Sequence, residues 1–582
     1  MLQRSLLGLL VCGVAAIAKR SDAQAAGRLA IDSLLTRVHA CAVTTSFERA
    51  IASGEPLAQL PQVARGAWET EAACWRAVAS QAERMPVSGL TAEDHLTVKV
   101  VRWEAGMQQA RAPHWWVDFS TITPYASPIG YVSRAIGALP IRAPADTTQA
   151  LRLLREIPVL IDSIRAGIEQ RAARGIRLSR AALPASTALL RAYTIRGSAN
   201  PFSINAARAA ALDESTRAAV MRASDRVVDS SIVPSASRLV ALLEGSYAQQ
   251  APDGVGLSQY PGGAAYYEWL VRWHTTLEAS PTAVHAIGLA EVARIDSAMA
   301  TIRAGIGFLG TKAQFHAQLA RDPRFFASTP DEVGARLMSY AKRLEPLLDK
   351  AFSSRPRARG DVRRLPAVLE PSMTFGYYQE PTASDSMGHY LYNGTKLSER
   401  TLLTAAPLIA HELWPGHHFQ VNLLRENAHL PPYRKAFRTA YGEGWGDYAS
   451  IVAGELGLYA DPMDAYGRLA MDMFLSCRLV VDTGMNALGW SRERAIAFMR
   501  ERVLESETQI ASESLRYSTD IQGQALAYKM GSNEFMRLRT RAQMALGQKF
   551  DLRAYHDQVL TSGMLPLSVL GDKIETWIAV QR

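Results

Sequence analysis

The sequence has few cysteines and no long apolar run, and both deficits narrow the class of protein. Four cysteines occur in 582 residues, and their spacings fit no cysteine-based zinc site. After the N-terminal leader no segment is long and apolar enough to cross a bilayer, so we expect no stable membrane span in the mature chain. The P-loop, the dinucleotide fingerprint and the G-x-S-x-G elbow are also missing.

Strong charge of one sign is lacking as well. The net charge is +9, and the excess basic residues are spread along the chain without a basic tail or an aromatic-basic repeat. We therefore expect no nucleic-acid partner. A hydrophobic fraction of 48% with 20% charged residues is typical of a globular protein that buries a large core.

The N-terminus has the pattern of an export signal. Arg4 precedes an apolar stretch, Leu6–Ala18, which is too short to span a membrane, and Ala23–Ala25 fits an A-x-A cleavage site. We predict a signal peptide over residues 1–25 and a mature chain that begins near Ala26. The predicted location is periplasmic or secreted.

Export would permit disulfide bonds. Cys41 and Cys74 fall on neighbouring predicted helical segments and can pair with each other. Two buried free thiols are the other interpretation, and the sequence leaves both open.

Most of the chain is predicted to be helical, because apolar residues recur at spacings of three and four. The clearest helices are predicted over Ala150–Arg174, Ser215–Leu243, Pro281–Ile306 and Asp331–Phe352. Between Ala367 and Lys396 the segments MTFGYYQ and GHYLYNG instead predict two strands around a polar loop. The expected fold class is mainly α, a large two-lobed helical fold with a small β-sheet beside the candidate site.

Loop residues interrupt the helices near residue 250, in the segment QQAPDGVGLSQYPGG. This break predicts an N-terminal helical lobe over residues 26–250 and a second lobe with the candidate site over residues 251–582. A loop within one large domain is the alternative interpretation.

The decapeptide HELWPGHHFQ, residues 411–420, begins like the zinc-peptidase motif H-E-x-x-H but has Pro415 where the second histidine belongs. Proline disrupts a helix, so a kink or bulge is expected there. Such a distortion would bring His417 to a metal held by His411. On a regular helix His418 would return to roughly the same face but lie about 10 Å further along the axis. We favour His417 as the ligand and give His418 a supporting or substrate-binding role.

A zinc hydrolase needs about three protein ligands and a base for the attacking water. Glu443, in TAYGEGWGDYAS, is the candidate third ligand, with Asp447 as a less favoured choice. The glycines on either side of Glu443 would let two helices approach closely. Glu412 follows a ligand directly and is the candidate general base, and the expected cofactor is Zn²⁺.

Several ordered motifs resemble a bacterial domain-of-unknown-function family that carries the signature HExxPGHHxQ. The resemblance runs from about residue 30 to the C-terminus. The matching segments are YYEWLVRWHTTLEASPTAVHAIGLAEVARI, HELWPGHHFQ, EGWGDYAS, CRLVVDTGMNALGWSRERAI, RYSTDIQGQALAYKMG and LGQKFDLRAYHDQVLTSGMLPLSVL. The resemblance implies a zincin-like, mostly helical metallopeptidase fold, distantly similar to thimet oligopeptidase and neurolysin. Relatives usually have a histidine where this chain has Asn486, so a substrate or metal contact of theirs is in doubt here.

Amide hydrolysis also needs hydrogen-bond donors for the developing oxyanion. Tyr528 is the best candidate, with Gln524 four residues before it on the expected helix face. Arg516 and Tyr517 are candidates for substrate binding or support of the site, although Arg516 fits an ordinary salt bridge and Tyr528 a core aromatic equally well.

We expect a zinc-dependent metallopeptidase that hydrolyses short peptides by activating water. The alternative is a metal-dependent hydrolase or lyase of a small amide or an amino-acid derivative. A binding protein with a vestigial metal site is the third hypothesis, and the intact Glu412 argues against it.

Overall fold

The computed structural model describes residues 25–42, 59–85, 89–139, 141–367, 369–370, 376–382 and 385–582. The predicted signal peptide, except its last residue, lies outside the described residues. The chain divides into two compact units. The first comprises Met1–Arg177 and Leu183–Ala251, and the second comprises Leu178–Ala182 and Pro252–Arg582.

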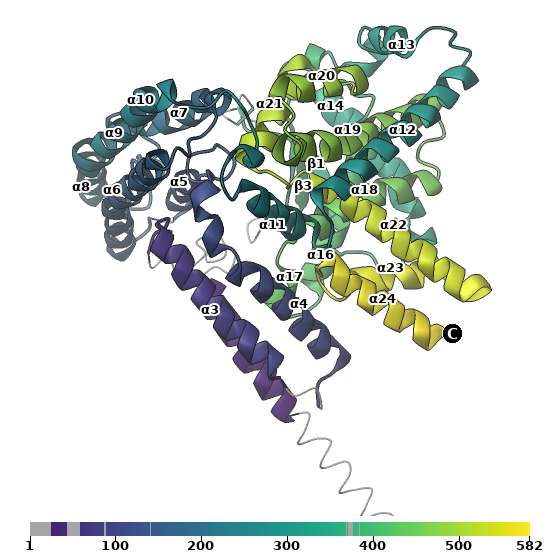
Figure 1. Cartoon of the computed structure of the whole chain (residues 1–582), viewed down its shortest axis with the longest axis horizontal. Helices are drawn as coiled ribbons and strands as arrows, with labels where there is room; N and C mark the ends of the chain where they lie inside the picture. The colour runs from purple at the N-terminus through teal and green to yellow at the C-terminus, as the bar shows by residue number, and fades with distance from the viewer. Residues whose placement is uncertain are drawn as a thin grey trace, which may run out of the picture. The chain divides into compact units, whose positions relative to one another are not determined.

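The first unit is helical throughout the elements that the structure describes (Figure 1). After a helix over residues 25–42 come α3 (Arg65–Glu83), α4 (Ala92–Gln109), α5 (Pro128–Ala138), α6 (Pro144–Ala173), α7 (Leu183–Arg191), α8 (Glu214–Val227), α9 (Val233–Glu244) and α10 (Ser246–Gln249). The helix predicted over 215–243 is continuous in path but contains a π-helical turn, Val228–Ile232, between α8 and α9.

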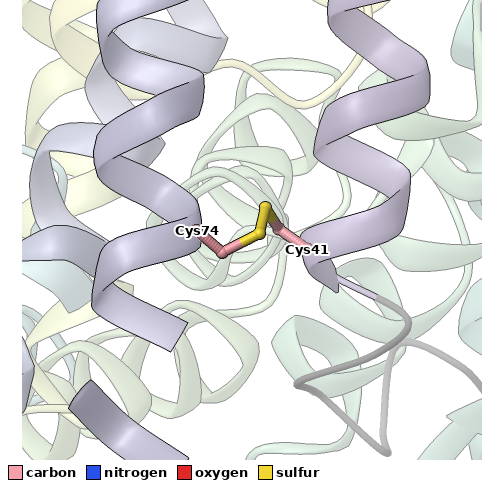
Figure 2. The surroundings of a disulfide bond; sticks show 2 residues. All are labelled: Cys41 and Cys74. Atoms are coloured by element: carbon pink, nitrogen blue, oxygen red, sulfur yellow. A yellow bond between two sulfur atoms is a disulfide. The ribbon is translucent and has the colours of Figure 1, made fainter. Parts of the chain in front are cut away.

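A disulfide bond joins two helices of this unit. Cys41, near the end of the helix over residues 25–42, pairs with Cys74 on α3, and their Cα atoms lie 5.8 Å apart (Figure 2). The sequence left the pairing open, and the structure decides for the disulfide over two free thiols. The bond closes a stretch of chain that separates the two cysteines by 33 positions.

The second unit holds the candidate site. Its helices are α11 (Gly263–Thr275), α12 (Pro281–Gly305), α13 (Lys312–Leu319), α14 (Pro330–Leu344), α15 (Ala405–Glu412), α16 (His417–Glu426), α17 (Pro432–Lys435), α18 (Thr439–Glu455), α19 (Pro462–Ala487), α20 (Arg492–Arg502), α21 (Glu507–Leu515), α22 (Leu526–Leu546), α23 (Leu552–Leu560) and α24 (Leu567–Gln581). The predicted helices over 281–306 and 331–352 are confirmed as α12 and as α14 with a following 3₁₀ turn, Glu345–Lys350. The mainly helical fold class is confirmed.

Two close helix pairs form the frame of the second unit. Helix α12 packs along α19, and α18 packs along α22. Small residues allow both approaches, since a methyl group on Gly288 would lie 2.7 Å from Leu479 Cβ, and one on Gly444 would lie 2.5 Å from the Cα of Gly531. Helix α24 covers α22 and α23 near the C-terminus (Figure 1).

The described part of the chain contains one small sheet in the order β1-β3-β2, formed by β1 (Gly360–Arg364), β2 (Tyr377–Gln379) and β3 (Gly388–Tyr392). Strands β2 and β3 are antiparallel, with Tyr378 opposite Tyr390, and confirm the predicted pair. Strand β1 was not predicted, because GDVRR lacks an apolar alternation, and it pairs with β3 in parallel. The central strand β3 is buried along its whole length.

Among the described helices, none combines the length and the apolar character that crossing a membrane requires.

Candidate metal centre

The sequence HELWPGHHFQ forms two helices rather than one kinked helix. Helix α15 ends at Glu412, helix α16 begins at His417, and the bond between Trp414 and Pro415 in the gap is cis. Gly416 is required at this break, because a methyl group there would lie 1.7 Å from the carbonyl oxygen of His411. The predicted kink therefore understates the distortion, which places His411 at the end of one helix and His417 at the start of the next.

Helix α18 brings Glu443 to these two histidines. Its Oε2 lies 3.5 Å from His411 Nε2 and 3.3 Å from His417 Nε2. One ligand atom from each of the three residues lies within 4.8 Å of the others. Two ligands about 2.0–2.2 Å from a tetrahedral zinc are separated by about 3.3–3.6 Å, so the two histidine–glutamate separations fit such an ion.

The residues around Glu443 hold the site together. A methyl group on Gly446 would lie 2.6 Å from His411 Cε1, so the imidazole packs directly on the backbone of α18. Trp445 Nε1 donates a hydrogen bond of 2.9 Å to the carbonyl oxygen of Pro415, which fixes the helix break against α18. Asp447, the less favoured ligand candidate, is instead paired with Arg468 at 3.0 Å.

Charge in the cluster is arranged around the Glu443 carboxylate. Burial raises its pKa, but hydrogen bonds from His411 and His417 outweigh burial and hold the pKa well below the usual range. Burial lowers the pKa of His417, and the contact with Glu443 overcomes this effect and raises it. The cluster thus pairs an anion with two ring nitrogens at close range, and a bound divalent cation would take the place of the shared protons.

Glu412 lies beside the triad with a different balance of charge. Burial is the main cause that raises its pKa, the negative Glu443 adds to the rise, and His417 and His411 oppose it. A carboxylate with a raised pKa accepts a proton more readily near neutral pH. The sheet contributes Tyr390, whose phenol interacts electrostatically with Glu412 and receives a backbone hydrogen bond from Gly376.

His418 faces the sheet and is not one of the three grouped residues. Its Nε2 donates to the Ala358 carbonyl oxygen at 3.0 Å, and its Nδ1 accepts from Tyr378 Oη at 3.0 Å. Burial lowers its pKa to about 4. A methyl group on Gly360 would lie 3.1 Å from this ring, so His418 fills the space under β1 and β3 and supports the site.

Tyr528, on α22, is next to the triad. Its ring stacks on that of His411, with centroids 6.1 Å apart and an interplanar angle of 18°. The guanidinium of Arg478 lies 4.9 Å from the centroid of the Tyr528 ring. Burial is the main cause that raises the pKa of Tyr528 to about 12, so the phenol keeps its proton and can donate a hydrogen bond at neutral pH.

Gln524 does not share a helix face with Tyr528, because it lies in the turn before α22, which begins at Leu526. Its side chain still forms a hydrogen bond with Tyr528. Arg516 Nη2 donates to Gln524 Oε1 at 2.7 Å, and Arg516 Nη1 lies 3.4 Å from Glu513. The expected proximity of Gln524 and Tyr528 therefore holds, but a turn produces it.

Tyr517 and Asn486 are buried and have internal partners. Tyr517 Oη accepts a hydrogen bond of 2.7 Å from Arg478 Nε. Asn486 Nδ2 donates to the carbonyl oxygen of Tyr517 at 2.9 Å, and its Oδ1 accepts from the backbone N–H of Leu257 at 3.1 Å. Both side chains join segments of the unit around the site.

Sequence reasoning missed Arg478 and Tyr390. Arg478 is a buried cation in the middle of an otherwise apolar stretch of α19, and that isolation was a signal that could have marked it. Tyr390 carried no such signal, because its position beside Glu412 depends on the pairing of β3 with a distant strand.

The fold and the site together define a mainly helical protein with a His₂Glu group that could hold a metal ion. The chain belongs to the bacterial family described as "Bacterial protein of unknown function (DUF885)", which matches residues 48–574. No curated protein matches the chain.

Two solved structures share the fold. One, described as "the putative lipoprotein from Colwellia psychrerythraea", has a TM-score of 0.86 and 25% sequence identity over 95% of this chain and 100% of that chain. The other, described as "a putative lipoprotein of unknown function from Shewanella oneidensis", has a TM-score of 0.71 and 16% identity over 94% of this chain and 99% of that chain.

Proposed function

We propose that this protein is an exported zinc-dependent metallopeptidase that hydrolyses short peptides. The observation that carries the proposal is the convergence of His411, His417 and Glu443, with separations of 3.3 and 3.5 Å that suit tetrahedral zinc, directly beside Glu412. Zinc bound there would supply a Lewis acid and lower the pKa of water toward about 7. A purely structural zinc site needs four ligands and has no use for a base.

Three residues of this chain would carry out proton transfer and stabilise the oxyanion. Glu412 would take the proton from the attacking water and return it to the leaving amine, a role that its raised pKa supports. Tyr528, held against His411, would donate a hydrogen bond to the developing oxyanion. Gln524 would orient that phenol through their shared hydrogen bond.

Export is supported by three observations. The segment from Arg4 to Ala25 has the pattern of a signal peptide, and the two similar solved structures are each described as a "putative lipoprotein". The disulfide bond between Cys41 and Cys74 is also typical of an oxidising compartment.

The test is a comparison of the zinc-loaded wild type with Glu412→Gln on a peptide library and on small amides. The variant should retain zinc and the fold, because Glu412 is not a ligand, and lose nearly all turnover. Glu455→Gln, at the end of α18, is the control: it also replaces a carboxylate by an amide, but away from the site, and should keep turnover. Turnover near that of the wild type in Glu412→Gln would contradict the mechanism, and cleavage of small amides alone would replace the peptidase by the alternative hydrolase.

A further inference from the structure

Asp482, on α19, is a fully buried carboxylate to which the proposed mechanism gives no role. Four hydrogen bonds end on its two oxygens. Tyr267 Oη donates to Oδ1 at 2.7 Å, Asn486 Nδ2 donates to Oδ1 at 3.1 Å, and the backbone N–H of Gly523 donates to Oδ1 and Oδ2 at 3.1 and 3.0 Å. A buried carboxylate is tolerated only with such partners, so its position and theirs are mutually fixed.

Gly523 is the residue whose backbone N–H binds this carboxylate. Its φ of +77° lies in the left-handed region, which favours glycine, and it belongs to the turn that leads into α22. The next residue is Gln524, which bonds to Tyr528. The contact with Asp482 therefore fixes the position of this turn and, with it, the position of the N-terminal end of α22.

Asn486, one helical turn after Asp482, fixes the other end of the same segment. It donates to the carbonyl oxygen of Tyr517 and so holds the π-helical turn Arg516–Asp520 against α19. Together the two side chains anchor residues 517 and 523 to one face of α19. Gln524 lies in the turn that follows this anchored segment, and Tyr528 lies in the first turn of α22 beyond it.

Tyr528 is sensitive to this anchoring because of what it touches. Its ring stacks on His411, one of the three grouped residues, and the guanidinium of Arg478 lies 4.9 Å from the centroid of the same ring. A displacement of the turn would move the phenol relative to His411 and change the place at which it meets an oxyanion.

We propose that Asp482 is a positioning residue that holds the Gly523 turn and thereby aims the phenol of Tyr528 at the metal centre. The role of that phenol rests on the proposed function, whereas its placement by Asp482 does not. Asp482 acts through Tyr528 and does not touch the substrate. A substitution that removes the hydrogen bonds between Asp482 and Gly523 should reduce the rate of the chemical step and leave substrate binding nearly intact.

Asp482→Asn tests this assignment, because it keeps the shape but turns one acceptor oxygen into a donor that faces donors. We expect kcat to fall up to about 100-fold, with KM and zinc content nearly unchanged. In the Tyr528→Phe background the same substitution should cost less than about twofold more, since coupled changes are not additive. Thr483→Val is the matched control: it removes a buried hydroxyl at the next position of α19 whose partners are His285 and backbone carbonyls of its own helix.

A second readout is independent of catalysis. In protein labelled with 3-fluorotyrosine, the ¹⁹F resonance that Tyr528→Phe removes should shift or broaden in Asp482→Asn and stay in place in Thr483→Val. If the wild type cleaves no substrate, the proposed function is wrong. The shift of this resonance still tests whether Asp482 positions Tyr528. If Asp482→Asn does not fold, Tyr267→Phe removes one donor to the carboxylate and should shift the resonance in the same sense.

An unmoved Tyr528 resonance in a folded Asp482→Asn or Tyr267→Phe variant would overturn the assignment. An equal loss of kcat with and without the Tyr528 phenol would also overturn it, because Asp482 would then act on the fold as a whole.

Discussion

At the scale of single residues, the candidate centre depends on where three ring systems point. His411 and His417 turn their Nε2 atoms toward Glu443, while His418, the next residue, turns away and bonds to Ala358 and Tyr378. Adjacent residues at the start of a helix point in different directions, about 100° apart, so one can face the metal centre and the other the sheet. The sequence could favour His417 over His418, but only the helix break between Leu413 and Gly416 decides the geometry.

Tyr528→Phe tests the oxyanion role at this scale. Loss of one such donor costs about 100- to 1,000-fold in rate, so kcat should fall by that factor while zinc binding stays intact and KM changes little. Steady-state kinetics and zinc analysis of the purified variant measure both. Tyr340→Phe, which removes a phenol bonded to Asp464 elsewhere in the unit, should leave kcat unchanged. A kcat within about threefold of the wild type in Tyr528→Phe would remove the phenol from the mechanism.

At the scale of elements, helix ends and close helix contacts build the site. Helices α15 and α16 meet at a break, and α18 approaches α22 through Gly444 and Gly531. Sequence periodicity predicted the long helices and the β2–β3 pair well, because those patterns are local. It missed β1, because a parallel pairing joins distant segments and GDVRR carries no alternation. It also placed Gln524 on a helix, since i and i+4 spacing cannot distinguish a helix from the turn that precedes it.

Gly446→Ala tests the packing of α18 on the metal ligands. The added methyl group would lie 2.6 Å from the His411 ring, so the imidazole must leave the position in which its Nε2 faces Glu443. We expect zinc affinity to drop and the free energy of unfolding to fall by about 1–3 kcal/mol. Zinc titration and urea denaturation measure the two effects. Gly305→Ala, where a methyl group meets no atom within 4 Å, is the control: it should leave zinc affinity unchanged and should not lower the free energy of unfolding. Unchanged zinc affinity in Gly446→Ala would show that the ring does not depend on this contact.

His556→Gln tests how a buried neutral histidine joins α23 to its neighbours. Its ring bonds to Tyr448 Oη and the Ala351 carbonyl oxygen, and burial lowers its pKa from 6.5 to about 3. Below about pH 6.5 His556 is protonated in the unfolded chain but stays neutral in the folded protein. The free energy of unfolding therefore decreases as the pH falls. The variant should be the less stable protein at about pH 7.5, and the gap should narrow by about 1.4 kcal/mol for each pH unit below 6.5.

Urea denaturation of both proteins at about pH 7.5, 5.5 and 4.5 follows this gap directly. A gap that stays constant across the series would mean that the histidine titrates alike in the folded and unfolded chains.

At the scale of the whole molecule, the two units differ in their covalent cross-links. Both bury apolar side chains, but the first also has the disulfide bond between Cys41 and Cys74 (Figure 2), whereas Cys477 in the core of the second is a free thiol. The division of the chain near residue 250 coincides with a loop-rich segment that is visible in the sequence, whereas the cysteine pairing is not, because it requires knowing that two helices lie side by side.

Reduction of the disulfide should destabilise the first unit and spare the metal centre. For a separation of 33 positions the chain-entropy model gives a loss of about 3–4 kcal/mol in the free energy of unfolding. Urea denaturation with and without reductant measures it, together with zinc content. The Cys477→Ala variant should keep the sensitivity to reductant, and a variant with both Cys41→Ala and Cys74→Ala should lose it. Equal stability of the oxidised and reduced wild type would contradict the prediction.

The proposed function requires that this chain hold one catalytic zinc between α15, α16 and α18. An anomalous difference map at the zinc edge, from crystals of the zinc-loaded mature protein, tests it most directly. We expect one strong peak about 2.0–2.2 Å from His411 Nε2, His417 Nε2 and a Glu443 carboxylate oxygen. No peak among these three residues, or a peak bound by His418 in place of His417, would contradict it.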